Sequence, residues 1–398
     1  MKKSDNQFFK FEREVTSQDY QVLNQMLDYF RVSAFFENNT ATQIFYAFGL
    51  KNSWQTLPQK VNTMVFGANA FDGQHSKEEL MNGFWFEPEI VVSITNGRLQ
   101  SNTVELDSIL ANHQQTHDIK RLQIKKIISE TDWIQRVDDL IKNLNDVKSP
   151  IDKVVFGRQE MIELSEQNRA SCLLQALRMQ HNVYHVILKR ENEIFVSATP
   201  ERLVFVSQGE IQTAAVAGTT PRDRDPHRDR ELGNSLLHSL KNQREHQFVV
   251  DSIKMKLEAI TTQLNVPSKP ILLQNKQVQH LYTPISGTLS ANMSVKDLVD
   301  NLHPTPALGG VPQKEALQYI AQHEQQPRGL FAGPIGYATA DNTGELVVGI
   351  RSMYCEQTRA RLFAGAGIVA GSEAQQEYDE TALKFKPMLQ LLGELTHD

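Results

Sequence analysis

The clearest pattern in the sequence is a set of short apolar runs separated by polar or glycine-containing turns. Runs of this length and composition, bounded by turn residues, are typical of antiparallel strands. The first group lies at residues 183–189, 194–198, 203–207 and 211–216, and the second at residues 335–340, 346–354 and 361–369. Each group is expected to form a meander. Because a helical stretch follows each group, the pattern predicts an α+β fold built on large antiparallel sheets.

Three stretches carry the apolar period of helices. The first is charged and spans residues 118–147, where the following Ser-Pro pair is a natural helix stop. The second is expected to run from a charged loop near residue 230 to about residue 264. The third closes the chain, with Ser372 and Gln375 in the spacing of a capping box and Gly393 as its expected C-cap.

The distribution of motifs and glycines along the chain changes near residue 148. Before this point short apolar runs alternate with polar stretches, and no spacing suggests chemistry. The meanders, most of the glycines and the candidate functional residues all follow it. We therefore expect residues 1–148 to be an N-terminal variable part of the fold and residues 149–398 to be its catalytic part.

Composition excludes several classes of protein. The 398 residues include 41 Lys and Arg against 47 Asp and Glu, a net charge of −6, which argues against nucleic acid or an anionic membrane as the main partner. The two cysteines, Cys172 and Cys355, are not in a spacing that holds zinc or a redox disulfide. The first residues lack the apolar run of a secretory signal, and no stretch approaches the ~20 apolar residues of a membrane span. A cytoplasmic location is expected.

Glycines concentrate toward the end of the chain. Residues 301–398 hold 11 of the 21, so the backbone there is expected to turn tightly or to approach a ligand closely. The run from Gly365 through Gly367 to Ala370 matches a relaxed dinucleotide fingerprint. That interpretation fails, because no second parallel strand and no acidic residue follow at the required distance. A strand end that touches some other ligand, or simple tight packing, remains open.

Carboxylates on two helices are candidate metal ligands. Glu377, Glu380 and Lys384 share one face of the terminal helix, and Glu245 is bordered by apolar Phe248 and Val249. A solvated, ion-paired face is the ordinary explanation for the first group, and a structural role is the ordinary one for Glu245. Oxygen ligands from two helices would nevertheless suit Mg²⁺, which takes one or two carboxylates plus water and substrate oxygens.

Three further residues are candidates for chemistry. Arg351 is expected to share a strand face with Gly349, whose missing side chain would leave room for an anion, although an ion pair with a glutamate is equally reasonable. Lys153 precedes an apolar run that would favour its neutral, basic form, but most lysines at strand starts are only solvated. Glu201 lies between Pro200 and an apolar run, where a half-buried protonated carboxyl would serve as a general acid.

Taken together, these stretches resemble the chorismate-utilising enzymes and, within them, the isochorismate synthases. The resemblance covers roughly residues 150–393 and rests on many motifs that occur in the family's order. They are Asp152-Lys153-Val154-Val155 with Arg158; Ala198-Thr199-Pro200-Glu201; Ala217-Gly218-Thr219 with Arg222; Arg244-Glu245-His246; His280-Leu281; Leu302-His303-Pro304-Thr305-Pro306-Ala307; Gly333-Pro334-Ile335-Gly336; Ile350-Arg351; and Ala364-Gly365-Ala366-Gly367-Ile368-Val369 with Glu377, Glu380 and Lys384.

The resemblance implies a single large domain in which two big antiparallel β-sheets are flanked by helices and enclose the active site. It implies Mg²⁺ bridging a substrate carboxylate to Glu245 and Glu380, with Glu377 completing the metal environment. The other implied contacts to substrate come from Arg351 and Lys384 at its carboxylates, from the backbone around Gly218, Thr219, Gly365 and Gly367, and from His280 beside the ring.

The implied reaction is hydration of chorismate at ring C2 with loss of the C4 hydroxyl. Lys153 would be the neutral base that activates water, and Glu201 the protonated acid that helps the hydroxyl to leave. The implied substrate is a small molecule, no glutamine amidotransferase subunit is expected, and the chain is expected to act as a monomer. The product would feed menaquinone or catecholate siderophore synthesis.

Three alternatives share parts of this pattern. Anthranilate and aminodeoxychorismate synthases use ammonia and usually lack a lysine at position 153, and the latter carry a lysine where this chain has Ala217. Salicylate synthases share both Lys153 and Glu201 and go on to eliminate pyruvate, so they are the closest alternative. A chorismate-binding protein without catalysis is disfavoured, because every expected polar residue is present.

Overall fold

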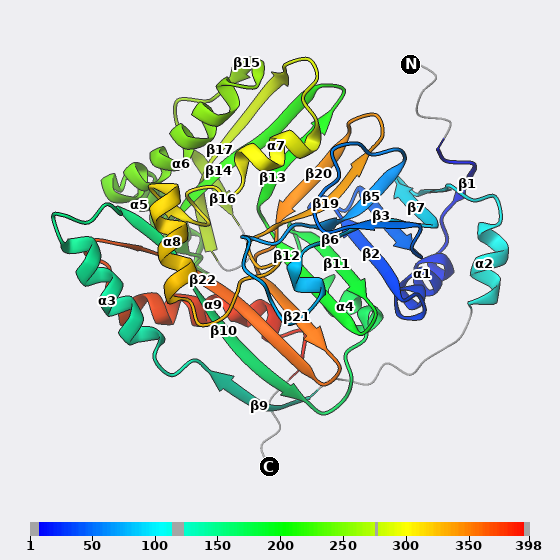
Figure 1. Cartoon of the computed structure of the whole chain (residues 1–398), viewed down its shortest axis with the longest axis horizontal. Coiled ribbons are helices and arrows are strands. Elements are labelled where there is room, and N and C mark those ends of the chain that lie inside the picture. Colours follow the sequence, from blue (N-terminus) through cyan, green and yellow to red (C-terminus); the bar gives the residue numbers. More distant parts are fainter. Residues whose placement is uncertain (1–7, 114–122, 275–277, 394–398) are drawn as a thin grey trace.

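Two large antiparallel sheets form the framework of the protein in a computed structural model, which describes residues 8–113, 123–274 and 278–393 (Figure 1). The first sheet has the strand order β1 (Phe11–Glu14), β8 (Arg98–Ser101), β7 (Ile90–Thr95), β3 (Gln43–Phe48), β2 (Val32–Glu37), β11 (Tyr184–Arg190), β12 (Glu193–Thr199), β21 (Ser352–Glu356), β22 (Arg359–Val369), β10 (Lys153–Leu164) and β18 (Gly310–Val311), with β9 (Ile124–Ser129) also beside β10. The second has the order β15 (Thr261–Asn265), β17 (Val278–Leu289), β14 (Glu210–Pro221), β13 (Arg202–Ser207), β20 (Gly344–Val348), β19 (Pro334–Thr339), β5 (Met64–Ala68), β6 (Phe84–Glu87) and β4 (Asn52–Trp54), with β16 (Ile271–Gln274) also beside β17.

Helices cover the sheets and join their strands. They are α1 (Ser17–Tyr29), α2 (Leu106–Asn112), α3 (Trp133–Asn145), α4 (Ala170–Leu177), α5 (Pro226–His238), α6 (Leu240–Glu258), α7 (Val295–Leu302), α8 (Gln313–His323) and α9 (Ala374–Leu389), with a short 3-10 turn η2 (Leu80–Asn82). Helix α6 packs against β14 of the second sheet, and α9 packs against β22 of the first (Figure 1). Among the described residues, none of these helices combines the length and the apolar character that crossing a bilayer requires.

The expected α+β fold with two big antiparallel sheets and flanking helices is confirmed. Strands from both sides of residue 148 pair within each sheet: β2 pairs with β11 in the first, and β5 pairs with β19 in the second. The buried core follows the same plan. Phe36, Phe45 and Phe66 from the N-terminal part pack around Tyr337 from the C-terminal part. Both parts therefore contribute to one fold, and the division near residue 148 as a functional boundary stays a prediction.

Neither expected meander stays in one sheet. Strands β11 and β12 belong to the first sheet, whereas β13 and β14 belong to the second. The predicted single strand at residues 346–354 is wrong, because β20 ends in the second sheet and β21 begins in the first. The break is made by Gly349, where a Cβ atom would approach the Leu330 carbonyl oxygen to 2.6 Å, and by Arg351, which has a φ of 47°. Each expected meander therefore contains a passage of the chain from one sheet to the other.

The expected helices also need correction. Part of the first stretch is the strand β9, which pairs with β10, and only α3 is helical; its residues 118–122 lie outside the described part. The second stretch is divided at Ser239, whose side chain accepts a hydrogen bond from Asn242 N and caps α6, and its end forms β15. The capping box predicted for α9 does not form. Its N-cap is Glu373, and Ser372 Oγ instead accepts a hydrogen bond from Val369 N at the end of β22.

Candidate active site

Two chain segments cross between the sheets side by side, and each carries a predicted site residue. One passes from β12 to β13 through Glu201, and the other from β20 to β21 through Arg351. Two backbone hydrogen bonds join them: Val348 N donates to Glu201 O at 3.0 Å, and Ala198 N donates to Arg351 O at 3.0 Å. The fold therefore brings Glu201 and Arg351 together although 150 positions separate them in the sequence. Gly349 serves the crossing and not, as expected, an anion beside the guanidinium.

Lys153 lies at the start of β10, where its ammonium group meets a carboxylate from α6. Its Nζ atom donates to Glu245 Oε1 at 2.7 Å, and the lysine is only 8% exposed. Gly367 on the neighbouring β22 leaves room for this pair, because a Cβ there would lie 3.1 Å from Lys153 Cε and 3.8 Å from Glu245 Oε1. The second sheet's helix and the first sheet's strands therefore meet at Gly367.

A second pair of opposite charges lies one strand step away. Lys384 Nζ on α9 donates to the Gly365 carbonyl at 2.7 Å and pairs with Glu380 at 2.6 Å. Gly365 and Gly367 are two positions apart in one strand. They therefore lie about 7 Å from each other and face the same side of the sheet. The pairs Lys153–Glu245 and Lys384–Glu380 are consequently neighbours along β22. Glu377 lies one helical turn before Glu380, and burial together with the charge of Glu380 raises its pKa.

The second sheet contributes a hydrogen-bonded pair from adjacent strands. Thr219 on β14 and His280 on β17 are directly opposite each other, with 2.9 Å between Thr219 Oγ1 and His280 Nδ1. Gly218, with a φ of 74°, forms a bulge before Thr219, and a Cβ there would lie 3.3 Å from Asn242 Oδ1 on α6. The backbone around Gly218 and Thr219 is expected to approach the substrate. In the structure Gly218 lies beside α6, and Thr219 contacts His280.

Electrostatic coupling shows that these groups share one interior. Burial, followed by Arg351 and Lys384, lowers the pKa of His280 to about 4, so its ring is neutral near pH 7. Burial raises the pKa of Glu380, but Lys384, Arg351 and His280 outweigh this effect and hold the pKa below its usual value. Burial also lowers the pKa of Arg351, and Glu380 opposes that shift. Cations and carboxylates from both sheets therefore influence one another.

Glu201 differs from the other acidic residues of the site. Burial alone raises its pKa to about 7, and no neighbouring cation offsets the effect. A carboxyl group in this condition is substantially protonated near neutral pH and can donate a proton. The expected acid at this position therefore has the environment that the role requires.

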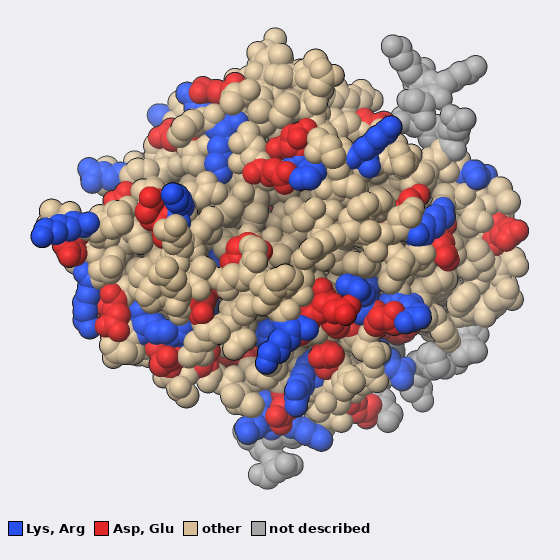
Figure 2. Space-filling model, in the orientation of Figure 1, with Lys and Arg blue, Asp and Glu red and all other residues tan. Residues whose placement is uncertain are grey.

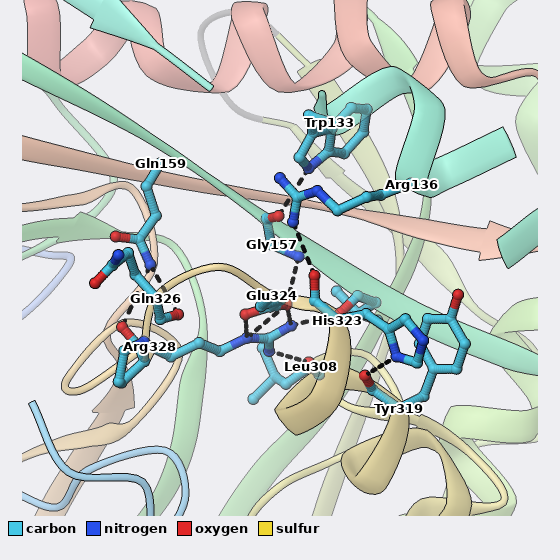
Figure 3. Close-up of polar contacts among 12 residues, drawn as sticks. Trp133, Arg136, Gly157, Gln159, Leu308, Tyr319, His323, Glu324, Gln326 and Arg328 are labelled. Carbon is cyan, nitrogen blue, oxygen red and sulfur yellow. Dashed lines mark hydrogen bonds and ion pairs between the residues drawn. The ribbon is translucent and has the colours of Figure 1, made fainter. Parts of the chain in front are cut away.

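The strand that carries Lys153 is held along its outer edge by side chains. Between its pairings with β18 and β9, β10 has no strand partner on that side among the described residues. Figure 3 shows what replaces one. Arg328, which is 1% exposed, donates to the Val155 carbonyl at 2.5 Å and pairs with Glu324, while Glu324 accepts from Gly157 N at 2.6 Å and Trp133 donates to Gly157 O at 2.7 Å. These contacts fix the strand because buried backbone groups must be paired.

The carboxylates of the site are suited to Mg²⁺ on chemical grounds. In the described part of the chain, no cluster of three or more His, Cys, Asp or Glu residues converges closely enough to hold a metal unaided. Mg²⁺, however, commonly takes one or two protein carboxylates and completes its shell with water and substrate oxygens. Glu245 lies beside Gly367 of β22, and Glu380 pairs with Lys384, whose ammonium group donates to the Gly365 carbonyl two positions earlier. The donor set fits a cation that is shared with a substrate.

Sequence reasoning missed several residues that complete the site. Asn242 lies beside Gly218, and Ser372 hydrogen-bonds to Glu377 instead of capping α9. Ser197 and Ser352 donate to the backbone of the segment that carries Arg351. No local signal marks these residues, because serine and asparagine are ordinary at strand and helix ends. All twelve predicted site residues nevertheless lie on the elements that meet here, and their individual roles remain predictions.

The fold and site define a class: a protein of two large antiparallel sheets whose interior brings carboxylates, lysines, an arginine and a histidine together. The chain belongs to the Chorismate binding enzyme family, whose model matches residues 3–393. It is similar to the isochorismate synthase MenF of Bacillus subtilis, with 37% identity over 267 residues that make up 67% of this chain and 56% of that protein. It is 38% identical to the salicylate biosynthesis isochorismate synthase of Pseudomonas aeruginosa over 262 residues, or 66% of this chain and 54% of that protein.

Structural comparison extends the likeness along nearly the whole chain. The menaquinone-specific isochorismate synthase MenF of Escherichia coli superposes with a TM-score of 0.84 and 25% identity, covering 96% of this chain and 94% of that one. The sequence alignments, in contrast, span little more than half the length of the two curated relatives. The family and the fold are therefore established.

Proposed function

We propose that the protein is an isochorismate synthase, which converts chorismate reversibly to isochorismate by adding water at C2 with loss of the C4 hydroxyl. The observation that carries the proposal is Lys153, a lysine held inside the site beside bare glycine backbone and Glu245. Water is a poor nucleophile near neutral pH and needs a base, whereas ammonia does not. The names of the similar proteins from Bacillus subtilis and Escherichia coli support the same activity.

Each charged group has a part in the proposed mechanism. Arg351 and Lys384 bind the two carboxylates of chorismate and fix the ring between the sheets. Lys153 would take a proton from the attacking water, for which its amine must be released from the ion pair with Glu245. Glu201 donates a proton to the departing C4 hydroxyl, for which its pKa of about 7 is suitable. The neutral His280 packs beside the ring and is oriented by Thr219.

Glu245 and Glu380 would hold Mg²⁺, and Glu377 would complete its environment. When bound, the cation would polarise the carboxylate that is conjugated to the ring diene and stabilise the charge that develops as water adds. With the cation bound, the negative charges of Glu245 and Glu380 would not repel the substrate carboxylate. Gly367 of β22 leaves room beside Lys153 and Glu245.

With water as the nucleophile, the enzyme has no need of a glutamine amidotransferase subunit. We propose that it works as a monomer in the cytoplasm and supplies isochorismate to menaquinone or catecholate siderophore synthesis. The identity of the neighbouring genes distinguishes these two pathways.

The test is product analysis with wild-type enzyme, chorismate and Mg²⁺ in ¹⁸O-labelled water. Isochorismate labelled at C2 is expected, without stoichiometric release of pyruvate. Stoichiometric pyruvate together with salicylate would select salicylate synthase instead. An aminated product formed with ammonium would overturn the role given to Lys153.

Lys153→Ala tests the base directly. Its kcat is expected to fall by roughly 10²–10⁴, which is the usual effect of losing a general base, while the fold is preserved. Lys142→Ala is the matched control, because Lys142 pairs with Asp139 on the exposed face of α3. The control should keep wild-type kcat.

A further inference from the structure

The segment that carries Arg351 has an unusual backbone. It consists of residues 349–351, between the end of β20 and the start of β21. Arg351 has a φ of 47°, in the left-handed region, where a residue with a Cβ atom is disfavoured by about 1 kcal/mol. A conformation of this kind persists only where its surroundings hold it in place. Arg351 is also the guanidinium to which the proposed function gives a substrate carboxylate.

Three consecutive carbonyl groups of this segment are held by neighbouring strands. Ser352 Oγ donates to the Gly349 carbonyl at 2.9 Å, and Ser197 Oγ donates to the Ile350 carbonyl at 2.7 Å. Ala198 N donates to the Arg351 carbonyl at 3.0 Å. The first two of these bonds come from side chains, which supplement the backbone bonds that Gly349 makes to Ala332 and Gly333 where the segment leaves the sheets.

The two serines form a pair across the sheet. Ser197 on β12 and Ser352 on β21 are directly opposite each other in the register of the first sheet, and both are 0% exposed. Their chain neighbours Val196 and Met353 are equally buried and apolar. A buried hydroxyl group in such a setting is unfavourable unless it is hydrogen-bonded. Ser197 donates its hydroxyl to the Ile350 carbonyl, whereas the Gly349 carbonyl accepts from Ala332 N at 2.9 Å as well as from Ser352.

We propose that Ser197 and Ser352 are positioning residues that hold Arg351 in its left-handed conformation and thereby aim its guanidinium at the substrate carboxylate. The inference rests on the proposed function, since it requires that Arg351 binds chorismate. Neither serine touches substrate in this account. Both act through the backbone of residues 349–351.

The first experiment measures steady-state kinetics of Ser197→Ala with chorismate and Mg²⁺. KM is expected to rise about tenfold, the effect of losing one buried hydrogen bond that orients a binding group, while kcat stays within about twofold. Ser352→Ala is expected to raise KM in the same way but by less, because Ala332 N still donates to the Gly349 carbonyl, and it serves as the second variant if the first is not folded. Ser33→Ala is the matched control, because Ser33 is also 0% exposed and its hydroxyl donates to a backbone carbonyl, Leu27 O, at 3.0 Å.

The control separates positioning from general stability. All three variants are expected to lower the thermal unfolding midpoint to a similar degree, but only Ser197→Ala and Ser352→Ala should raise KM. A wild-type KM in both of these variants would overturn the inference. Equal increases of KM in the Ser33 variant would also overturn it, because the effect would then be structural.

A double-mutant cycle tests whether the serine acts through the arginine. In an Arg351→Ala background, Ser197→Ala is expected to cause no further increase in KM. Additive increases would contradict the inference. Failure of the wild-type enzyme to convert chorismate would instead contradict the proposed function, so the two failures are distinguishable.

Discussion

At the scale of single residues, Arg351 combines a buried guanidinium with a backbone held between two sheets. Among the described residues, the charge of Glu380 opposes the effect of burial on the pKa of Arg351. If the guanidinium binds a substrate carboxylate in this dry setting, Arg351→Ala should raise KM and lower kcat/KM by about 2–4 kcal/mol. The control is Arg31→Ala, which removes an exposed pair with Glu191 and should change kcat/KM by less than about 1 kcal/mol. If both substitutions changed kcat/KM by the same amount, the role of Arg351 would be structural.

Glu201 allows a prediction about pH and activity. Burial raises its pKa to about 7, and only the protonated form can act as the acid. The kcat of the wild-type enzyme is therefore expected to decrease as pH rises through about 7. In Glu201→Gln, which has no proton to donate, kcat should be low at every pH and this decrease should disappear. A pH profile unchanged by the substitution would contradict the role.

The same shift makes a prediction about stability. The folded-state pKa of Glu201, about 7, lies above its ordinary value of 4.5, so the folded state keeps a proton that the unfolded state releases. Stability is therefore lost as pH rises from about 4.5 through 7. Glu201→Gln removes this loss and should gain on the order of 2 kcal/mol in free energy of unfolding above pH 7, with no gain near pH 4. Urea unfolding at both pH values measures it.

At the scale of elements, strand β22 determines how closely helices α6 and α9 approach the site. Gly367 leaves the space in which Lys153 and Glu245 meet. In Gly367→Ala the new Cβ would lie 3.1 Å from Lys153 Cε, so the flexible lysine must move while the strand stays. We expect kcat to fall roughly tenfold to a hundredfold, as for a misplaced catalytic group, with a nearly unchanged unfolding midpoint.

A glycine elsewhere provides the control for this substitution. Gly73 has no atom within 4 Å of a Cβ position and lies outside the left-handed region. Gly73→Ala should therefore keep wild-type kcat. If Gly367→Ala also kept wild-type kcat, the close packing of Lys153 against β22 would be irrelevant to catalysis.

At the scale of the whole molecule, the proposed metal joins the two halves of the site. Glu245 comes from α6, which packs on the second sheet, and Glu380 comes from α9, which packs on the first. Excess EDTA should abolish turnover, and Mg²⁺ should restore it. Mg²⁺ with chorismate should also raise the unfolding midpoint of the wild-type enzyme, and Glu245→Gln should lose this shift. Full turnover in excess EDTA would refute the metal assignment.

The molecular surface agrees with a small-molecule enzyme. Figure 2 shows basic and acidic side chains intermixed on the face in view, without a continuous patch of one sign. On that face, the charges therefore do not form a surface of one sign for a charged macromolecule.

Much of this protein can be read from the sequence alone. The apolar runs predict β11 to β14, β19 and β22, because a short apolar run bounded by turn residues is a local property of the sequence. The α+β class followed from them. The candidate residues from Lys153 to Lys384 were chosen by motif, and the elements that carry them do meet in one interior.

Only the tertiary structure decided where the chain leaves one sheet for the other. The crossings at Glu201 and Arg351 are held by hydrogen bonds between segments 150 residues apart, and local periodicity contains no record of such bonds. For the same reason Gly349 was assigned to an anion when it accommodates the Leu330 carbonyl, and Ser372 to a helix cap when it turns back to β22. The roles of Ser197 and Ser352 depend on the same crossing, because each hydroxyl binds a carbonyl of residues 349–350 that it reaches only where the chain leaves one sheet for the other.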